Sequence, residues 1–313
     1  MPRGIYTQTV CILLRDSVTL AQLQPLLEQY TIRKQVQASD NWGFGGPTYV
    51  IDYRPEVNGY VAVDVVNHPW PDDMGDPKED PEIFGAWSMS GFGPVTFPAG
   101  LTRAMQQSWV WPEGKTLPTQ HQGFIRVRSS YAFGADENAP IWPDDYDAEQ
   151  DLEFVTKVAT SLLVLPQALC YFNPGGEVLR NRELTEECLE YSAERSLPPL
   201  ELWSNVRLFN IDERFSLMDT VGNQQLDLPD LEAVFSRDYD CGEVDGFLRN
   251  VTYYLLSNGD GIKDHDTLDG PRNIRWQAHR FENGLTVPPR PVICFLPMDE
   301  NEPPQEVLER KDT

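Results

Sequence analysis

The stretch from Trp42 to Arg128 limits the folds open to this chain more than any other part of it. It holds five of the chain's eight tryptophans, together with many of its prolines and glycines. Large rings need neighbours to pack against, whereas proline and glycine interrupt helices and strands. We therefore expect a folded, irregular surface here, neither a plain helix nor a solvated linker, and we treat it as the candidate working surface.

The 313-residue chain is long enough to bury a core, as one large domain or two closely packed ones. No run of about eighteen apolar residues occurs that could span a bilayer. The first residues lack the long apolar core and cleavage site of a signal peptide. Five widely spaced cysteines without a CxxC pair are expected to be reduced core residues rather than disulfides or zinc ligands. We therefore expect a cytoplasmic protein.

The chain is strongly acidic. It has 49 Asp plus Glu against 25 Lys plus Arg, a net charge of −24. Such a charge repels phosphate backbones and anionic lipids, and no Lys/Arg cluster offsets it. We therefore expect neither nucleic acid nor a membrane as a partner. A basic protein would be attracted and its association accelerated, although acidity also simply keeps a protein soluble.

Hydrophobic spacing predicts two units of similar order. The first is expected to contain a strand at 9–14, a helix at 20–30, a strand at 32–36 and a hairpin of strands at 49–53 and 60–66. The second is expected to contain a strand at 124–129, a helix at 152–163 and strands at 168–172 and 177–179. This repeated order suggests an internal duplication. It predicts an α+β fold of two similar strand–helix–strand–strand units, with mostly antiparallel sheets and helices packed on one face.

The rest of the chain completes the expected domain plan. After the second unit, the spacing predicts a surface helix at 185–195, a hairpin at 202–211 and 215–220, a helix at 244–255 and a last strand at 292–296. We expect residues 1–120 to form the first domain, with the Trp/Pro/Gly-rich insert, and residues 121–297 the second. Residues 298–313, charged and proline-bearing, are expected to be a flexible acidic tail.

The common motifs of chemistry are missing from the sequence. The four histidines form no HExxH or His/Cys ligand spacing, and no GxSxG or phosphate loop occurs. The stretch SNGDGIKDHDTLDG is similar to a calcium loop, but Ile262 stands at a ligand position and cannot bind the ion. We therefore predict no catalytic, cofactor-binding or metal-binding residue and no cofactor. His121 is the most site-like histidine, although a histidine held by a backbone partner is the commoner case.

Exposed aromatic residues are the usual anchors of protein interfaces. The candidate partner-binding residues in the irregular stretch are Trp70, Trp87, Phe92, Trp109, Trp111 and His121. The alternative is that most of these tryptophans are core residues, with one or two exposed in the segments around Trp87 or around Trp109 and Trp111.

Several segments share the order of a known family. They are FPAGLTRAMQQSW, HQGFIRV, EFVTKVATSLLVLPQALCYFNPGGEVL, FSLMDTVGNQQLDLPDLEAVF and DGFLRNVTYYLLSNGDGIKDHDTLDG. Over roughly residues 95–270 the chain thus resembles the bacterial domain-of-unknown-function family numbered 4261. The resemblance implies a cytoplasmic bacterial accessory protein, of a kind associated with secretion systems, type VI secretion included, and with toxin–immunity loci. It implies no activity that can be assigned to a residue.

These features favour a non-catalytic bacterial protein-binding protein, for example an immunity or accessory protein that docks a basic partner. The alternative is a hydrolase in which carboxylates and His121 meet in a cleft between the two units. A third hypothesis is a scaffold whose partner is a second copy of itself. The sequence does not indicate the oligomeric state.

Overall fold

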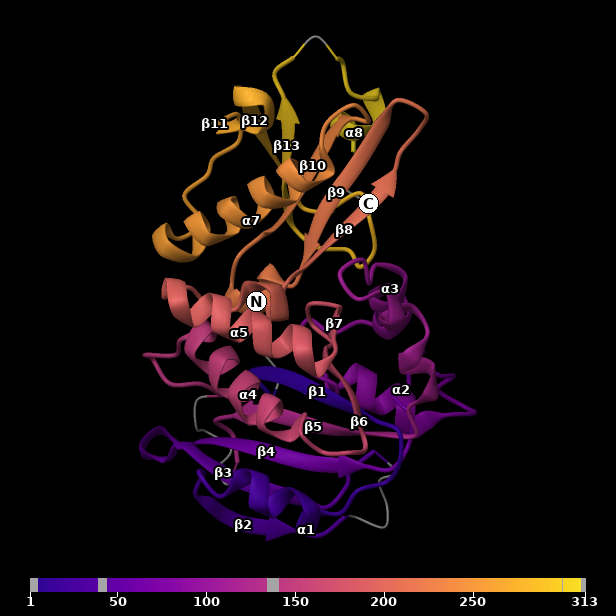
Figure 1. Cartoon of the computed structure of the whole chain (residues 1–313), viewed down its shortest axis with the longest axis vertical. Helices are drawn as coiled ribbons and strands as arrows, with labels where there is room; N and C mark the ends of the chain where they lie inside the picture. Colours follow the sequence, from indigo (N-terminus) through magenta and orange to yellow (C-terminus); the bar gives the residue numbers. More distant parts are fainter. Residues whose placement is uncertain (1–4, 39–43, 134–140, 300, 311–313) are drawn as a thin grey trace. The chain divides into compact units, whose positions relative to one another are not determined.

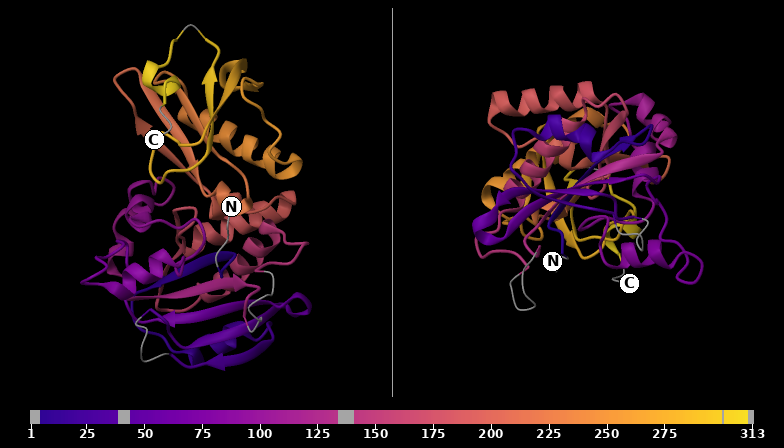
Figure 2. Two further views of the ribbon diagram at one scale, coloured as in Figure 1. Left: turned by 180° about the vertical axis from the view of Figure 1, so that it is seen from behind. Right: turned by 90° about the horizontal axis from the view of Figure 1, so that it is seen from below.

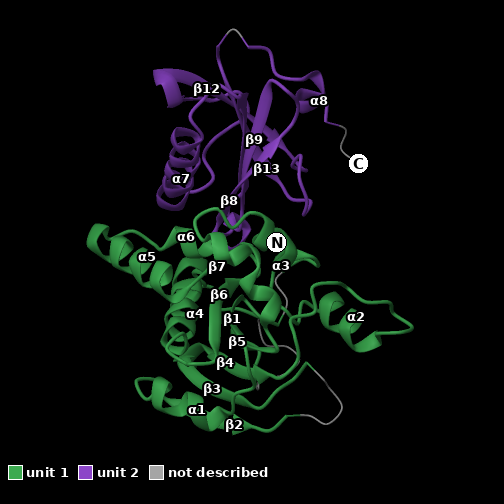
Figure 3. Cartoon of the chain, turned by 45° about the vertical axis from the view of Figure 1, so that its right-hand side comes forward, with its two compact units in different colours: residues 1–203 green, residues 204–313 purple. Residues whose placement is uncertain are grey.

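A computed structural model describes residues 5–38, 44–133, 141–299 and 301–310 (Figure 1). The chain divides into two compact units, residues 1–203 and 204–313, coloured green and purple in Figure 3. The boundary predicted at residue 120 instead falls inside unit 1. The reason is strand pairing, since β5 (Gly123–Ser130) pairs with both β1 (Gln8–Leu14) and β4 (Gly59–Val66). The two similar runs of elements therefore share one sheet.

Unit 1 is built on a seven-stranded antiparallel sheet with the order β2–β3–β4–β5–β1–β6–β7. Its other strands are β2 (Ile32–Val36), β3 (Thr48–Arg54), β6 (Ala168–Asn173) and β7 (Val178–Arg180). Its helices are α1 (Leu20–Leu23), α2 (Pro81–Ser88), α3 (Gly100–Gln106), α4 (Ala148–Leu162), α5 (Arg182–Arg195) and α6 (Leu200–Trp203).

Both faces of this sheet are covered. Helix α4 packs on one face, against β1, β5 and β6. On the other face Cys11, Leu13 and Phe124 belong to one apolar cluster with Trp70 and Trp87 from the irregular stretch. Figure 3 shows α4 and α5 on one side of the strands and α2 and α3 on the other. The α+β class and the mostly antiparallel sheets are as predicted, and the structure adds the covering of the second face.

Unit 2 is built on a six-stranded sheet with the order β11–β12–β13–β10–β9–β8. Its elements are β8 (Asn205–Asn210), β9 (Phe215–Val221), β10 (Asp230–Ser236), α7 (Cys241–Asn258), β11 (Thr267–Gly270), β12 (Ile274–Phe281), β13 (Val292–Pro297) and α8 (Gln305–Leu308). All pairs are antiparallel except β10 and β13, which run parallel.

The sheet of unit 2 is also covered on both faces. Helix α7 lies along one face (Figures 1 and 2), where Phe247 contacts Trp276 and Phe295. On the other face Val307 of α8 joins an apolar cluster with Cys294. Within the segment expected to be a flexible tail, Val307 is therefore buried against the sheet.

No helix in the described ranges is long and apolar enough to cross a membrane. The cysteines expected in the core, Cys11, Cys170 and Cys294, are buried and free of disulfides. Burial raises the pKa of Cys11 to about 12, so its thiol is a poor nucleophile at neutral pH.

Candidate functional site

Five of the six residues predicted to bind a partner are buried in unit 1, namely His121 and four aromatic residues. The exposed fractions of Trp70, Trp87, Phe92 and Trp111 are 4%, 7%, 0% and 3%. The Trp70 ring makes edge-on contacts with Phe92 and Phe124, at centroid distances of 5.1 and 5.3 Å. A buried ring offers no area to a partner, so these four side chains form core and not a docking surface.

Trp109 is the one predicted aromatic residue that the structure exposes, at 55%. Its indole Nε1 donates to Oε1 of Gln107 at 2.7 Å, and Nζ of Lys115 lies 4.2 Å from its ring centroid. Trp42, at the start of the irregular stretch, lies outside the described residues. Within the described part of the candidate surface, Trp109 is the one tryptophan exposed to solvent.

His121 is a structural residue in this fold. Its Nε2 accepts a hydrogen bond from the backbone N–H of Trp70 at 2.7 Å, and its Nδ1 contacts the carbonyl of Pro118 at 2.5 Å. A ring nitrogen that accepts from N–H carries no proton, so the ring is neutral with its proton on Nδ1. Burial lowers the pKa of His121, against opposing effects of the Pro118 hydrogen bond and of Asp72.

The ring of His121 therefore has no nitrogen left to accept a proton from a substrate. Both nitrogens contact backbone atoms of unit 1, the N–H of Trp70 and the carbonyl of Pro118, and neither of these contacts involves a carboxylate. This arrangement does not support the alternative in which His121 is the base of a hydrolase.

Unit 2 contains a buried charge network. It consists of Arg207, Asp219, Asp230, Glu232, Arg290 and Arg310. Asp230 and Glu232 come from the LPDLE segment, where alternation on β10 points both carboxylates to one face and Leu231 to the other. Asp219 stands opposite Glu232 in the register of β9 and β10. The LPDLE motif thus supplies two of the carboxylates that lie together inside the fold, and β9 supplies the third.

Each carboxylate of the network has an arginine partner. The guanidinium of Arg207 donates to both oxygens of Asp219, at 2.9 and 2.6 Å. Arg290 donates to Asp219 at 2.6 Å, and its Nε lies 3.3 Å from Oδ2 of Asp230. Nη1 of Arg310 lies 2.7 Å from Oε2 of Glu232. Because three positive charges match three negative ones, the network is self-contained and needs no ligand to neutralise it.

The pKa values of the three acids shift in different directions, because burial and the neighbouring arginines have opposite effects on them. For Asp219, burial favours the neutral form, but the charges of Arg207 and Arg290 and the hydrogen bonds outweigh it and lower the pKa. For Asp230, burial outweighs Arg290 and raises the pKa to about 6. Burial likewise raises the pKa of Glu232 despite Arg310. Asp219 is thus the anion around which the network is assembled.

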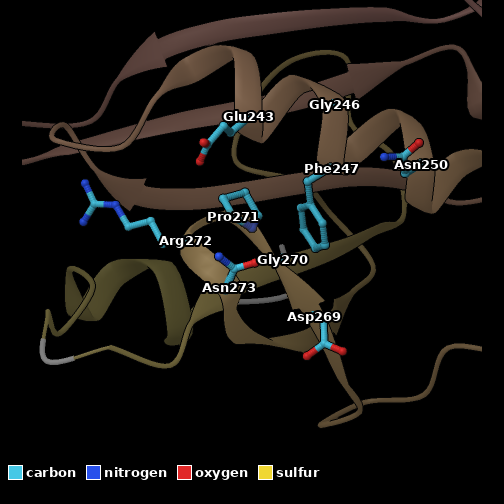
Figure 4. Close-up of a pocket in the computed structure, with 9 residues that line it drawn as sticks. All are labelled: Glu243, Gly246, Phe247, Asn250, Asp269, Gly270, Pro271, Arg272 and Asn273. Atoms are coloured by element: carbon cyan, nitrogen blue, oxygen red, sulfur yellow. The ribbon is translucent and has the colours of Figure 1, made fainter.

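A pocket of about 760 Å³ opens in unit 2 between α7 and the turn that joins β11 to β12 (Figure 4). Its polar lining includes Glu243 and Asn250 from α7, Asp269 from β11, and Arg272 and Asn273 from the turn. Arg272 and Asn273 have φ values of 62° and 55°. Residues other than glycine are uncommon in this left-handed region, and consecutive ones mark a turn that the surrounding fold enforces.

The pocket is acidic in effect. The guanidinium of Arg272 stacks 3.7 Å over the ring of Tyr239 and lies 2.9 Å from Oδ2 of Asp238. In Figure 4 it points away from Phe247. With that charge engaged outside, Glu243 and Asp269 are the charged side chains left on the lining, and Nε of Arg275 lies 3.3 Å from Oδ1 of Asp269. The carboxylate of Glu243 therefore suits the pocket to a cationic group of a ligand.

Unit 2 also brings together Asp264, His265 and His279. One possible ligand atom from each lies within 4.8 Å of the other two. Within the described residues this is the one group of three or more His, Cys, Asp or Glu side chains with metal-binding spacing. Carboxylate and imidazole together are donors for divalent transition metals.

Residues 219–296 match the family model described as a domain of unknown function (DUF4261). The resemblance drawn from the sequence is thereby confirmed over these residues, all of which lie in unit 2. Its segments before residue 219 lie outside the match. No curated protein and no solved structure matches the chain.

The DUF4261 region contains the pocket, the His–His–Asp group and four members of the buried charge network. Sequence reasoning overlooked all three features. The motif LPDLE was a signal for the network, because two acids at alternate positions of an apolar strand must point into one face. The pocket and the His–His–Asp group had no such signal. They depend on the pairing of β11 with β12, which no spacing in the sequence indicated.

Proposed function

We propose that this protein is a non-catalytic bacterial binding protein that docks a basic protein partner through the acidic pocket of the DUF4261 region. The main support for this proposal is the lining of the pocket. Glu243 and Asp269 lie on it, and the guanidinium of Arg272 pairs with Asp238 instead of with these two acids. A lysine or arginine side chain of a partner would meet the carboxylate of Glu243 there, and it would compete with the exposed Arg275 for Asp269. The aromatic Phe247 beside them would pack against its methylene groups.

The charge of the whole chain supports the same proposal. A net charge of −24 attracts a basic protein over a distance of about a Debye length, ~10 Å at 0.1 M salt. Such attraction raises the association rate, while the contacts in a pocket set the dissociation rate. A role as a cytoplasmic immunity or accessory protein of a secretion or toxin system, type VI secretion included, agrees with this charge and with the DUF4261 region.

The test is capture of basic proteins encoded by the neighbouring genes. The full chain is immobilised and each candidate is passed over it at about 50 mM salt, where electrostatic association is strong. We expect at least one basic protein to be retained and to elute as the salt concentration rises. Failure of every candidate to bind under these conditions would contradict the proposal.

The pocket variant is Glu243→Gln with Asp269→Asn, which removes both lining charges. The matched control is Glu213→Gln with Glu306→Gln. It also removes two exposed charges from unit 2, one of them likewise in the first turn of a helix. We expect the pocket variant to lose the captured partner and the control to retain it.

A further inference from the structure

We propose that Asp264, His265 and His279 form a binding site for a divalent transition-metal ion, with Zn²⁺ as the reference ion. The three ligand atoms already lie within 4.8 Å of one another. Two imidazoles and one carboxylate are a common donor set for such ions, and three protein ligands leave at least one position for water. The site lies in the DUF4261 region and is independent of the proposed docking function.

A β-bulge brings the two histidines together. The backbone N–H of His265 donates to the carbonyl of Ala278 at 2.7 Å, and the N–H of Ala278 donates to the carbonyl of Asp266 at 2.8 Å. Two consecutive residues thus oppose one residue of β12, and the first of them, His265, has φ 67°. This is the pattern of a G1 bulge, whose first position is usually glycine. Because His265 occupies this position instead of glycine, the bulge carries an imidazole side chain.

The bulge places the ring of His265 against the ring of His279. Their centroids are 5.2 Å apart and their planes meet at 84°. Residues 265 and 266 both oppose Ala278, and His279 is the next residue of β12, so the bulge sets the two imidazoles beside each other. The sheet therefore presents both imidazoles from a fixed backbone.

The carboxylate of Asp264 is also held in place. Its Oδ2 lies 3.2 Å from Nε2 of His265. Two ligands of a tetrahedral zinc ion are separated by roughly 3.3 Å, given bonds of about 2.0–2.1 Å. Its other oxygen, Oδ1, accepts from the backbone N–H of Arg280 at 3.1 Å. A hydrogen bond of this kind orients a ligating carboxylate.

The surrounding charges favour a cation. The guanidinium of Arg280 is engaged by both oxygens of Asp260, at 2.7 and 2.6 Å, so its charge is compensated.

The test is a calorimetric titration of the untagged full chain with Zn²⁺ at about pH 7.5, where histidine ligands are deprotonated. We expect one ion per chain. His265→Ala and His279→Ala should each weaken binding by roughly tenfold or more, and Asp264→Asn should weaken it as well. The matched control is His68→Ala, which removes an exposed histidine from unit 1 and should leave the affinity unchanged.

A Co²⁺ titration followed by visible absorption gives a second readout, because imidazole ligands change the ligand-field bands of the ion. Circular dichroism of each variant confirms that it is folded. If a histidine variant does not fold, the Zn²⁺ affinity of Asp264→Asn provides the test. This variant can keep the hydrogen bond from the backbone N–H of Arg280, because the amide oxygen of asparagine is also an acceptor. Unchanged Zn²⁺ affinity in the folded variants, or no binding by the full chain at ~100 μM Zn²⁺, would overturn the proposal.

Discussion

Trp70 and Trp109 show how much the surroundings of a single residue decide its role. Both lie in the same irregular stretch, but the exposed fraction is 4% for Trp70 and 55% for Trp109. Trp70 packs among Phe92, Phe124 and Phe172, and Trp109 packs beside the ammonium of Lys115. From residue type alone, both tryptophans were predicted to bind a partner. Only their packing in the fold shows that Trp70 is a core residue and Trp109 a surface residue.

Trp70→Ala is expected to lower the free energy of unfolding of unit 1 by about 3–5 kcal/mol, because it leaves a large cavity among four aromatic rings. Trp109→Ala is the control and is expected to change it by less than about 0.5 kcal/mol. Urea unfolding followed by fluorescence measures both. Equal losses for the two variants would mean that Trp70 is not a core residue.

The lowered pKa of His121 makes the stability of unit 1 depend on pH. The unfolded chain binds a proton near pH 6.5, whereas the folded chain resists it because Nε2 already accepts from Trp70. The stabilising contribution is therefore present above about pH 6.5 and is lost as pH falls below it.

NMR titration of the His121 ring should give a pKa below 6.5 and a neutral ring with its proton on Nδ1. A pKa above 6.5, or a proton on Nε2, would be inconsistent with the hydrogen bonds described for this residue.

At the scale of elements, the buried charge network joins the strands β8, β9 and β10 to the segment before β13. Asp219 and its partners Arg207 and Arg290 are between 0% and 2% exposed. Removing the Asp219 carboxylate would leave the buried guanidinium groups of Arg207 and Arg290 without this negative partner. A buried charge without a partner destabilises the folded state far more than an exposed one does. The network thus makes the packing of unit 2 depend on Asp219.

Asp219→Asn is expected to destabilise unit 2 by about 3–5 kcal/mol. The control is Glu186→Gln, which breaks an exposed ion pair with Arg182 on α5 and should cost less than about 0.5 kcal/mol. Hydrogen exchange of the amides of β9 and β10 measures the first effect, and exchange in α5 measures the second. A loss below about 1 kcal/mol in β9 and β10 would show that the network does not stabilise the unit.

Periodicity predicted many of the elements, because each depends on its own residues. The helix expected at 152–163 is α4, the helix at 244–255 is α7, and the strands of the hairpin at 49–66 are β3 and β4. The stretch expected to be irregular contains the short helix α2, which begins at Pro81, where proline is tolerated.

Strand pairing was much less accessible from the sequence. Nothing in the spacing of residues places β1 between β5 and β6, or β10 parallel to β13. Such partners are chosen by tertiary packing over long sequence distances. The His–His–Asp group depends on another pairing, that of β11 with its sequence neighbour β12, so a sequence tested only against calcium-loop spacing could not reveal it.

At the scale of the whole molecule, the chain consists of two compact units, each with its own sheet and core. In the described part of unit 2, the sheet, α7 and the buried charge network all come from residues after Ser204. We therefore expect a chain of residues 204–313 to fold alone and to unfold in one cooperative transition by circular dichroism. A fragment without cooperative unfolding would show that unit 2 depends on unit 1.

The most direct test of the docking proposal is the affinity of the captured basic partner for three forms of the full chain, measured by calorimetry at about 0.1 M salt. The account predicts that Glu243→Gln with Asp269→Asn weakens binding about tenfold or more, equivalent to about 1.4 kcal/mol. It predicts that Glu213→Gln with Glu306→Gln, at the same net charge, changes affinity by less than about twofold. Equal weakening in both variants would mean that net charge and not the pocket attracts the partner, and unchanged affinity in the pocket variant would contradict the account.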